Sequence, residues 1–250
     1  ADMKSVVLST TFSKAGNGGL KKAMDLLCAQ VSKAIENGAT IVVLSDRQMD
    51  AENCAIPSLL AVAGVHNYLL RNKTRTRVGL VIETGEPREM MHFALLIGYG
   101  AGGVCPYLAY ETALATAEEK IYVKDVNSKL AIPNYIKSTR KGLFKIIAKM
   151  GISTIQSYRG AQIFEAVGLN DEVISQFFTD TPSRVSGAGL DVIEKEVLMR
   201  HQLAYKNEDD LPAVLDTGGN YHWRRGGEEH MINPNSIALL QHATRSNNYN

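Results

Sequence analysis

The sequence predicts an α/β fold, in which a small parallel sheet with flanking helices is followed by a mainly helical half and an extended C-terminal linker. Three short apolar runs, 40–44, 78–82 and 103–108, alternate with helical patterns in the first half of the chain. Such alternation with short connections is typical of parallel strands joined by right-handed crossovers. Beyond the third run, helical periodicity continues without another strand pattern, which predicts the helical half.

Each element of the first half has a local signal. The runs 40–44 and 78–82 are continuous and apolar, as expected of strands buried on both faces. Asn17 is a candidate cap for the first helix, and Asn37 with Gly38 ends it. The expected elements are an edge strand near 6–8, a helix over 18–36, a strand over 40–44, a helix over 57–70, a strand over 78–82, a helix over 86–97 and a strand over 103–108.

The second half is expected to be helical around one polar hinge. Pro133 suits the first helical position because it has no amide hydrogen to lose there, and Gly151 and Gly168 suit the position after a helix end. Residues 179–189 are a loop by composition, and an extended linker is expected from 207 onward. The expected helices cover 108–117, 133–150, 159–167, 171–178, 190–203 and 236–244.

Composition excludes several classes of function. The chain has 250 residues and a formal net charge of +1, with no basic block and no acidic tail, so we expect no nucleic-acid partner. No apolar run is long enough to cross a membrane, and the N-terminus lacks the pattern of a secretory signal. These features predict a protein of the cytoplasm that works without a membrane.

The cysteines indicate a reducing compartment. Cys28, Cys54 and Cys105 are few, odd in number and far apart, so a disulfide framework is not expected. The same isolation argues against an iron–sulfur or zinc site, which needs clustered thiolates or histidines. We therefore expect no metal and no cofactor in this chain.

Two further motifs are interpreted as structural. The glycine-rich segment 98–103 closes a helix and precedes a strand, the reverse of the order that a dinucleotide-binding loop requires. His66 and His92 lie among apolar residues on helices, where a lone histidine is more often a hydrogen-bonded core residue than a ligand. His222 and His230 do not have the spacing of a zinc site.

Polar residues follow the first two buried strands. Asp46 with Arg47, and Glu83 with Thr84, come where these strands end, and ligands of open α/β sheets bind at that edge. One interpretation is that Asp46 and Glu83 are a pair of general acid and base carboxylates. The alternative is that they pair with Arg47, with Arg88 or with backbone amides at helix starts.

The hinge after residue 152 holds the best candidates for a binding or domain-interface role. With polar side chains between two amphipathic helices, it is suited to line a passage or to meet another domain, and Arg159 is suited to hold a carboxylate or phosphate. The alternative is helix capping, with Ser157 as the cap of a helix that starts near Arg159. The candidates are Ser153, Thr154, Gln156, Ser157, Tyr158 and Arg159.

The only tryptophan lies in the expected linker. Trp223 is followed by Arg224 and Arg225, and tryptophan and arginine concentrate at protein interfaces. The three residues are therefore a candidate docking element. The alternative is that Trp223 covers apolar surface of the protein itself.

Three long blocks carry a resemblance to a known family. The segments Lys149–Leu169, Leu44–Ala61 and Asp216–Glu228 resemble the large subunit of glutamate synthase and its single-chain ferredoxin-dependent form. The matches cover nearly the whole chain in family order, and they are far more specific than any short motif here. They correspond to the central domain of the family and to the lead into its flavin-binding barrel.

The resemblance implies a role in making two glutamates from glutamine and 2-oxoglutarate. In that family, a glutaminase domain with an N-terminal cysteine releases ammonia, which travels through a tunnel to an FMN-containing barrel supplied with electrons by an iron–sulfur cluster. This chain begins with Ala1 and has no cysteine cluster, so catalysis by the chain alone is not expected.

The implied domains are a connecting α/β domain over 1–205 and, over 206–250, a linker towards an FMN-binding barrel that the chain does not include. The implied partners are the glutaminase and FMN-binding domains of the same enzyme, in the cytoplasm or the plastid stroma.

Two rival hypotheses come from the residues themselves. The chain is alternatively a small independent enzyme that uses Asp46 and Glu83, or a stand-alone scaffold that binds partners through the Trp223 segment.

Overall fold

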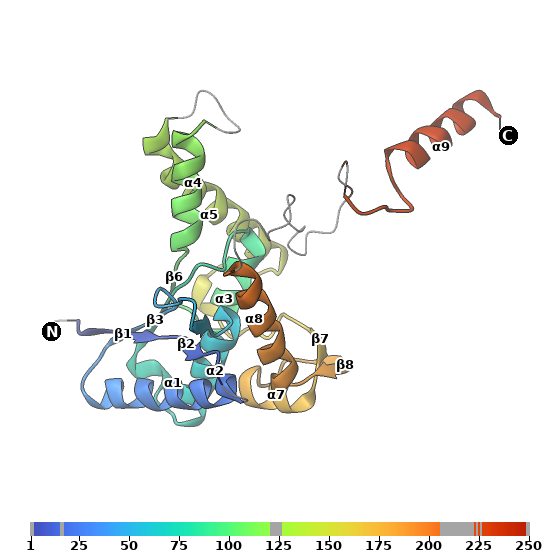
Figure 1. Cartoon of the computed structure of the whole chain (residues 1–250). Coiled ribbons are helices and arrows are strands. Elements are labelled where there is room, and N and C mark those ends of the chain that lie inside the picture. Colours follow the sequence, from blue (N-terminus) through green and yellow to red (C-terminus); the bar gives the residue numbers. More distant parts are fainter. Residues whose placement is uncertain are drawn as a thin grey trace. The chain divides into compact units, whose positions relative to one another are not determined.

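The computed structural model describes residues 3–15, 18–120, 127–205, 223, 225 and 227–248. The chain divides into two compact units, Ala1–Tyr205 and Lys206–Asn250 (Figure 1).

A four-stranded parallel sheet forms the centre of the first unit, as predicted. Its strands are β1 (Ser5–Ser9), β3 (Ile41–Ser45), β5 (Gly79–Glu83) and β6 (Gly103–Cys105), in the order β1-β3-β5-β6. All three pairings are parallel, and Leu44 lies opposite Ile82. The first strand is at the edge of the sheet, as expected, while the third predicted strand is only three residues long.

Three helices connect these strands and cover them. They are α1 (Gly19–Glu36), α2 (Ser58–Arg71) and α3 (Met90–Gly98). The prediction that the central strands are buried on both faces is wrong. One face packs in a core with α1 and α2, in which Val42, Leu44 and Leu80 have no exposed surface. On the other face, Ile41, Val43 and Val81 are partly exposed.

The start of α3 differs from the prediction. The helix begins at Met90 and not at Glu86, because Glu89 and His92 form a reciprocal capping box at that point. The Glu86 carboxylate serves a different helix. It accepts hydrogen bonds from the backbone N–H of Ser58 at 2.8 Å and from the Ser58 hydroxyl at 2.5 Å, at the first residue of α2.

A helical hairpin extends from the sheet, formed by α4 (Tyr107–Glu118) and α5 (Ala131–Lys149), which lie side by side (Figure 1). A 3₁₀ turn over Ser128–Leu130 precedes α5, so Pro133 occupies the third helical position and not the first. Both positions lack an amide partner within the helix, which is why proline is tolerated at either. The predicted stop at Gly151 is confirmed, with a left-handed φ of 71°.

The region after the hinge contains the main errors of the sequence interpretation. The helix predicted over 159–167 and the loop predicted over 179–189 are both wrong. Instead β7 (Ala166–Leu169) pairs in parallel with β8 (Ser183–Ala188). Left-handed backbone at Gly160 and Gln162 prevents a helix there. The predicted helices that follow are confirmed as α7 (Asp171–Phe177) and α8 (Leu190–Ala204).

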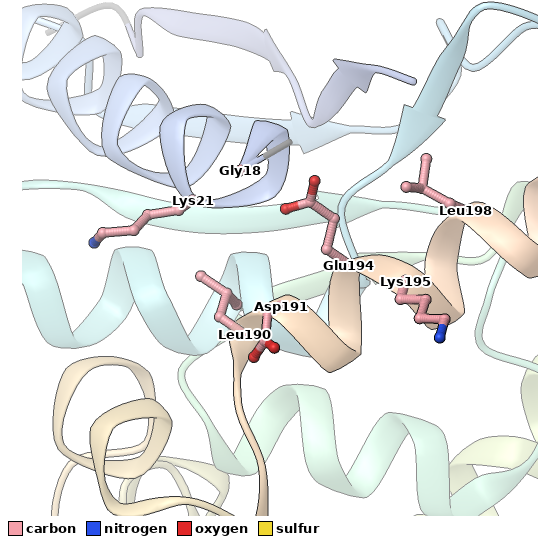
Figure 2. Close-up of a pocket in the computed structure, with 7 residues that line it drawn as sticks. All are labelled: Gly18, Lys21, Leu190, Asp191, Glu194, Lys195 and Leu198. Carbon is pink, nitrogen blue, oxygen red and sulfur yellow. The ribbon is translucent and has the colours of Figure 1, made fainter. Parts of the chain in front are cut away.

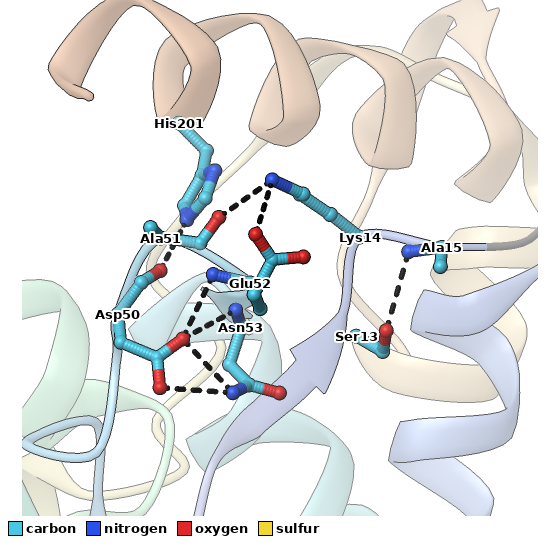
Figure 3. Close-up of polar contacts among 8 residues, drawn as sticks. All are labelled: Ser13, Lys14, Ala15, Asp50, Ala51, Glu52, Asn53 and His201. Atoms are coloured by element: carbon cyan, nitrogen blue, oxygen red, sulfur yellow. Dashed lines mark hydrogen bonds and ion pairs between the residues drawn. The ribbon is translucent and has the colours of Figure 1, made fainter. Parts of the chain in front are cut away.

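A short antiparallel ladder that the sequence did not reveal ties α8 to the sheet domain. Strand β2 (Thr11–Ser13) pairs with β4 (Asn53–Ala55), and the turn before β4 is held by the Asp50 carboxylate, which accepts from the Glu52 and Asn53 amides at 2.8 Å each (Figure 3). From α8, the Nε2 atom of His201 lies 2.7 Å from the Asp50 carbonyl oxygen.

The first turn of α1 is capped from α8. The N-cap is Gly18, with a left-handed φ of 74° and no side chain to accept a hydrogen bond, and the predicted cap Asn17 lies outside the described residues. The buried carboxylate of Glu194 accepts instead from the backbone N–H groups of Gly19 at 3.1 Å and Leu20 at 3.2 Å. A cavity of about 560 Å³ opens beside this contact (Figure 2).

In the second unit, the described residues contain one helix, α9 (Pro234–Ser246), where a last helix was predicted. Asn233 caps it by accepting from the amides of Asn235 and Ser236. None of its residues is buried, and Leu239 and Leu240 are 70% and 62% exposed. The linker predicted from 207 onward lies, up to residue 222, outside the described residues.

Glu194 gives a direct test of how α8 is joined to the sheet domain. Glu194→Ala leaves two amides at the start of α1 without their acceptor, and we expect the free energy of unfolding to fall by about 1–3 kcal/mol. Glu194→Gln keeps one acceptor oxygen and is expected to cost less. Urea unfolding measures both values.

The matched control is Glu196→Ala on the same helix. Glu196 is exposed and only forms an i,i+4 ion pair with Arg200 at 3.8 Å, so its loss should cost no more than about 0.5 kcal/mol. Equal effects at positions 194 and 196 would contradict a capping role for Glu194.

Candidate functional site

The predicted carboxylates do come from neighbouring strand ends, where the Asp46 amide donates to the Glu83 carbonyl oxygen at 3.2 Å, but Asp46 is fully engaged there. Its carboxylate accepts from the hydroxyl of Thr84 at 2.5 Å and from the Gly85 amide at 3.2 Å. The side chain is only 5% exposed. Burial and then the adjacent Asp46 raise the pKa of Tyr107, so this phenol keeps its proton beside the carboxylate. Asp46 thus holds the turn after β5 in place.

The carboxylate of Glu83 is likewise held by hydrogen bonds from its neighbours. It accepts from the hydroxyl of Ser45 at 2.6 Å and from Nε of Arg47 at 2.6 Å, and these two contacts lower its pKa. Arg47 also lies 3.5 Å from Glu111 and 4.1 Å above the ring of Tyr107. A carboxylate held ionised by such partners is a poor general acid, so the geometry favours the ion-pair interpretation of this edge over the catalytic one.

Of the six hinge candidates, four have exposed side chains, Tyr158 is buried and Arg159 is partly buried. The side chains of Ser153, Thr154, Gln156 and Ser157 are exposed. The cap is Thr154, whose hydroxyl oxygen accepts from the Ser157 amide at 3.2 Å, and the helix that it caps is α6 (Ile155–Tyr158). The prediction that Ser157 caps a helix from 159 is therefore wrong, because the chain turns away after Tyr158.

Tyr158 anchors the hinge to the hairpin. It has no exposed surface and packs in a second core with Ala94 of α3 and with Leu143 and Ile147 of α5. Its hydroxyl is buried without a hydrogen-bond partner among the described residues. A buried hydroxyl of this kind costs roughly 1–3 kcal/mol when left unsatisfied. The apolar ring, and not the hydroxyl, therefore fixes α6 in position.

A second polar cluster lies at the loop between α3 and β6, which the sequence analysis interpreted only as a structural glycine-rich segment. Arg75 donates from Nε to Nδ1 of His66 at 2.9 Å, and its other nitrogens reach the carbonyl oxygens of Val78 and Gly100, each at 2.8 Å. Gly100 has a φ of 118°, and a Cβ there would lie 2.3 Å from the His66 ring. Only glycine allows this approach.

Both histidines that the sequence placed in the core are hydrogen-bonded, as predicted. His92 accepts from the amides of Arg88 and Glu89 at the start of α3. At His66, Nδ1 accepts from Arg75, so a neutral ring carries its proton on Nε2. Burial, then Arg75 and then Arg159 lower the pKa of His66 to about 4.

Arg159 lies beside the same loop. One of its terminal nitrogens is 4.0 Å from the position that a Cβ would take on Gly102. Its Nε is buried and has no hydrogen-bond partner among the described residues. Arg159 also lowers the pKa of Arg75, which is depressed first by burial. Of the six hinge candidates, Arg159 alone carries a charge, and the fold brings it to a second arginine.

The Trp223 segment belongs to the second unit. Trp223 is 40% exposed, Arg225 is exposed, and Arg224 lies outside the described residues. Its docking role therefore stays a prediction.

The described residues include no group of three or more side chains placed to hold a metal ion. The three cysteines are free thiols, with Cys28 and Cys54 buried. In the part of the chain that the structure describes, no helix combines the length and apolar character needed to cross a membrane.

The His66–Arg75 contact predicts a dependence of stability on pH. The folded-state pKa of about 4 is below the ordinary value of 6.5, so between these values the unfolded chain binds a proton that the folded chain does not. Stability should therefore fall as the pH drops from 6.5 towards 4. After allowance for partial exposure, we expect a loss of about 2 kcal/mol from this residue.

Urea unfolding at pH 7 and pH 4.5 measures this loss. The variant His66→Asn keeps a hydrogen-bond acceptor near Nδ1 but does not titrate, so the difference between the two pH values should shrink by that amount. An unchanged difference would exclude His66 as its source.

Comparison with known proteins places these features in a family. A family model for the glutamate synthase central domain matches residues 1–170. The glutamate synthase [NADPH] large chain of Bacillus subtilis is 44% identical over 249 residues, which is 100% of this chain and 16% of that protein. A ferredoxin-dependent glutamate synthase of Arabidopsis thaliana, named chloroplastic/mitochondrial, is 38% identical over 97% of this chain and 16% of its own length.

Among solved structures, a flavocytochrome b2 with benzoylformate has 18% identity and a TM-score of 0.44, over 65% of this chain and 40% of that one, which is too low to support an argument. The chain thus spans about a sixth of the length of these two curated relatives. On the family model and on the identity along the whole chain, this protein belongs to the glutamate synthase family, as its central domain.

Proposed function

We propose that this chain is the connecting part of a glutamate synthase, which forms two glutamates from glutamine and 2-oxoglutarate. In this role it holds the glutaminase and flavin domains in register and helps to enclose the path of ammonia between them, and it is not catalytic alone. The observation that carries the proposal is the match of residues 1–170 to the central domain of that family.

The hydrogen bonds of the two carboxylates at the sheet edge support a connecting role. Asp46 and Glu83, the best candidates for acid and base chemistry, are occupied by Thr84, Ser45 and Arg47. Such contacts hold turns in fixed positions, which suits a domain that sets the distance between two active sites. The same occupation disfavours a small independent enzyme built on these carboxylates.

The proposed division of the chain follows from this role. Residues 1–205 form the connecting domain, and residues 206–250 lead towards an FMN-binding barrel. FMN and an iron–sulfur cluster belong to the parent enzyme and not to this chain, and the enzyme works in the cytoplasm or the plastid stroma. A walled path raises the local concentration of ammonia and prevents its loss to water.

The exposed hinge group is the proposed contact with a neighbouring domain. Thr154, Gln156 and Ser157 lie on one turn that is fixed to the hairpin through Tyr158. A short rigid turn with exposed polar side chains suits an interface, because little side-chain and backbone freedom is lost when it binds.

A chimeric enzyme tests the proposal. This chain replaces the corresponding segment of the Bacillus subtilis large chain, with which it shares 44% identity. We expect the chimera to form glutamate from glutamine and to bind FMN, while the isolated chain does neither. Bound FMN or turnover by the isolated chain would contradict the connecting role.

Hinge variants in the chimera test the ammonia path. A double variant, Gln156→Ala with Ser157→Ala, should lower the glutamine-driven rate more than the rate with added ammonium, by about tenfold if the path leaks. Gln202→Ala, an exposed glutamine on α8, is the matched control and should leave the ratio of the two rates unchanged. An equal fall of both rates would argue against a role in the path.

A further inference from the structure

We propose that Arg159 and Arg75 form a binding site for a carboxylate at the loop between α3 and β6. This inference goes beyond the connecting role and stands independently of it, because it rests only on the contacts of these side chains.

The fold brings two guanidinium groups, from different segments, to the loop between α3 and β6. Arg75 comes from the 3₁₀ turn η1 (Arg75–Arg77) and donates to the carbonyl oxygen of Gly100. Arg159 follows α6 and lies beside Gly102, two residues further along. The loop after Arg159 is itself fixed to the end of α3, because the Gly160 amide donates to the Gly98 carbonyl oxygen at 2.8 Å.

Within the described part of the chain, no counter-charge accompanies these two cations. Among the described residues, neither Arg75 nor Arg159 takes part in an ion pair. By contrast, Arg47 at the sheet edge contacts both Glu83 and Glu111. Partly buried like charges repel and are costly to remove from water, so an anion between or beside them would stabilise the arrangement.

The donors that remain fit a carboxylate. The Nε of Arg159 is buried and unpartnered, and with a terminal nitrogen it forms the planar fork that matches two carboxylate oxygens. All three nitrogens of Arg75 already donate, so Arg75 supplies its charge and fixes the loop. Arg159 is therefore the residue that contacts the ligand, and Arg75 is a positioning residue.

A small cavity adjoins this cluster. Its volume is about 110 Å³, and its lining residues include His66, which Arg75 contacts, and Gly160, which follows Arg159, but neither arginine. That volume suits a carboxylate group and is too small for a nucleotide. Asp180 also lines the cavity, and among the described residues it forms no ion pair with either arginine.

The backbone at the rim is strained in the way that binding sites often are. Gln162 and Asp180 both have left-handed φ angles, of 55° and 64°, although neither is glycine. Strained residues of this kind persist only where the surrounding structure holds them, and they concentrate at ligand sites.

Thermal unfolding of the full 250-residue chain tests the site, with sodium acetate as the probe and sodium chloride at equal ionic strength as the reference. We expect acetate at roughly ten times its Kd to raise the unfolding midpoint by about 3–5 °C above chloride. Arg159→Met should abolish this difference. Arg140→Met removes an exposed arginine of α5 and should keep it.

A second variant keeps the test valid if Arg159→Met fails to fold. Arg159→Lys retains the charge but loses the fork, so the acetate shift should fall to less than half. No acetate-specific shift in the original chain would overturn the proposal. An equal shift in the variants at positions 159 and 140 would do so too.

The chimeric enzyme identifies the source of the carboxylate. If the acetate shift disappears there and Arg159→Met destabilises the chimera, an acidic side chain of another segment fills the site. If the shift persists, the ligand is a free small carboxylate. An inactive chimera would count against the connecting role, while the result with the 250-residue chain would still decide whether the site exists.

Discussion

The burial of one face of β3 and β5 against helices is the constraint on which the rest of the first unit depends. Val42, Leu44 and Leu80 have no exposed surface, and the backbone groups of both strands are used by the sheet. Helices α1 and α2 cover that face, and the polar clusters gather at the two ends of the strands. The ion pairs lie where β3 and β5 end, and the arginine cluster lies at the opposite edge, where β5 and β6 begin.

The two polar clusters differ in whether their charged groups have partners of opposite charge. At the sheet edge, each carboxylate has a donor and Arg47 has two carboxylates, so every charged group has a partner within the chain. At the α3–β6 loop, Arg75 contacts Gly100 and Arg159 lies beside Gly102, and neither takes part in an ion pair among the described residues. A cluster whose charged groups are paired stabilises a turn, whereas two unpaired cations are stabilised by an anion from another molecule or segment. For this reason the cluster at the sheet edge is interpreted as structural, and the cluster at the α3–β6 loop is the candidate binding site.

The sequence predicted part of the candidate site for reasons that can be stated. Arg159 was a candidate because it is the only cation in a polar hinge, and His66 was expected to be hydrogen-bonded because it lies in an apolar helix. Arg75, which donates to His66, gave no signal, because its role depends on Gly100, which is 25 residues away. Asp46 and Glu83 were expected to be close because parallel strands end at one edge, yet their partners became clear only from side-chain geometry.

Local patterns in the sequence determined the parallel sheet, the helices around it and their glycine stops, because periodicity and backbone freedom act within a few residues. They failed for β7 and β8, whose pairing requires Gly187 to pack against Gly168, where a Cβ would lie 2.6 Å from a backbone oxygen. They also could not show that Glu194 caps a helix 174 residues away. The tertiary structure alone decided these features, because contacts between distant residues form only when the whole core has packed.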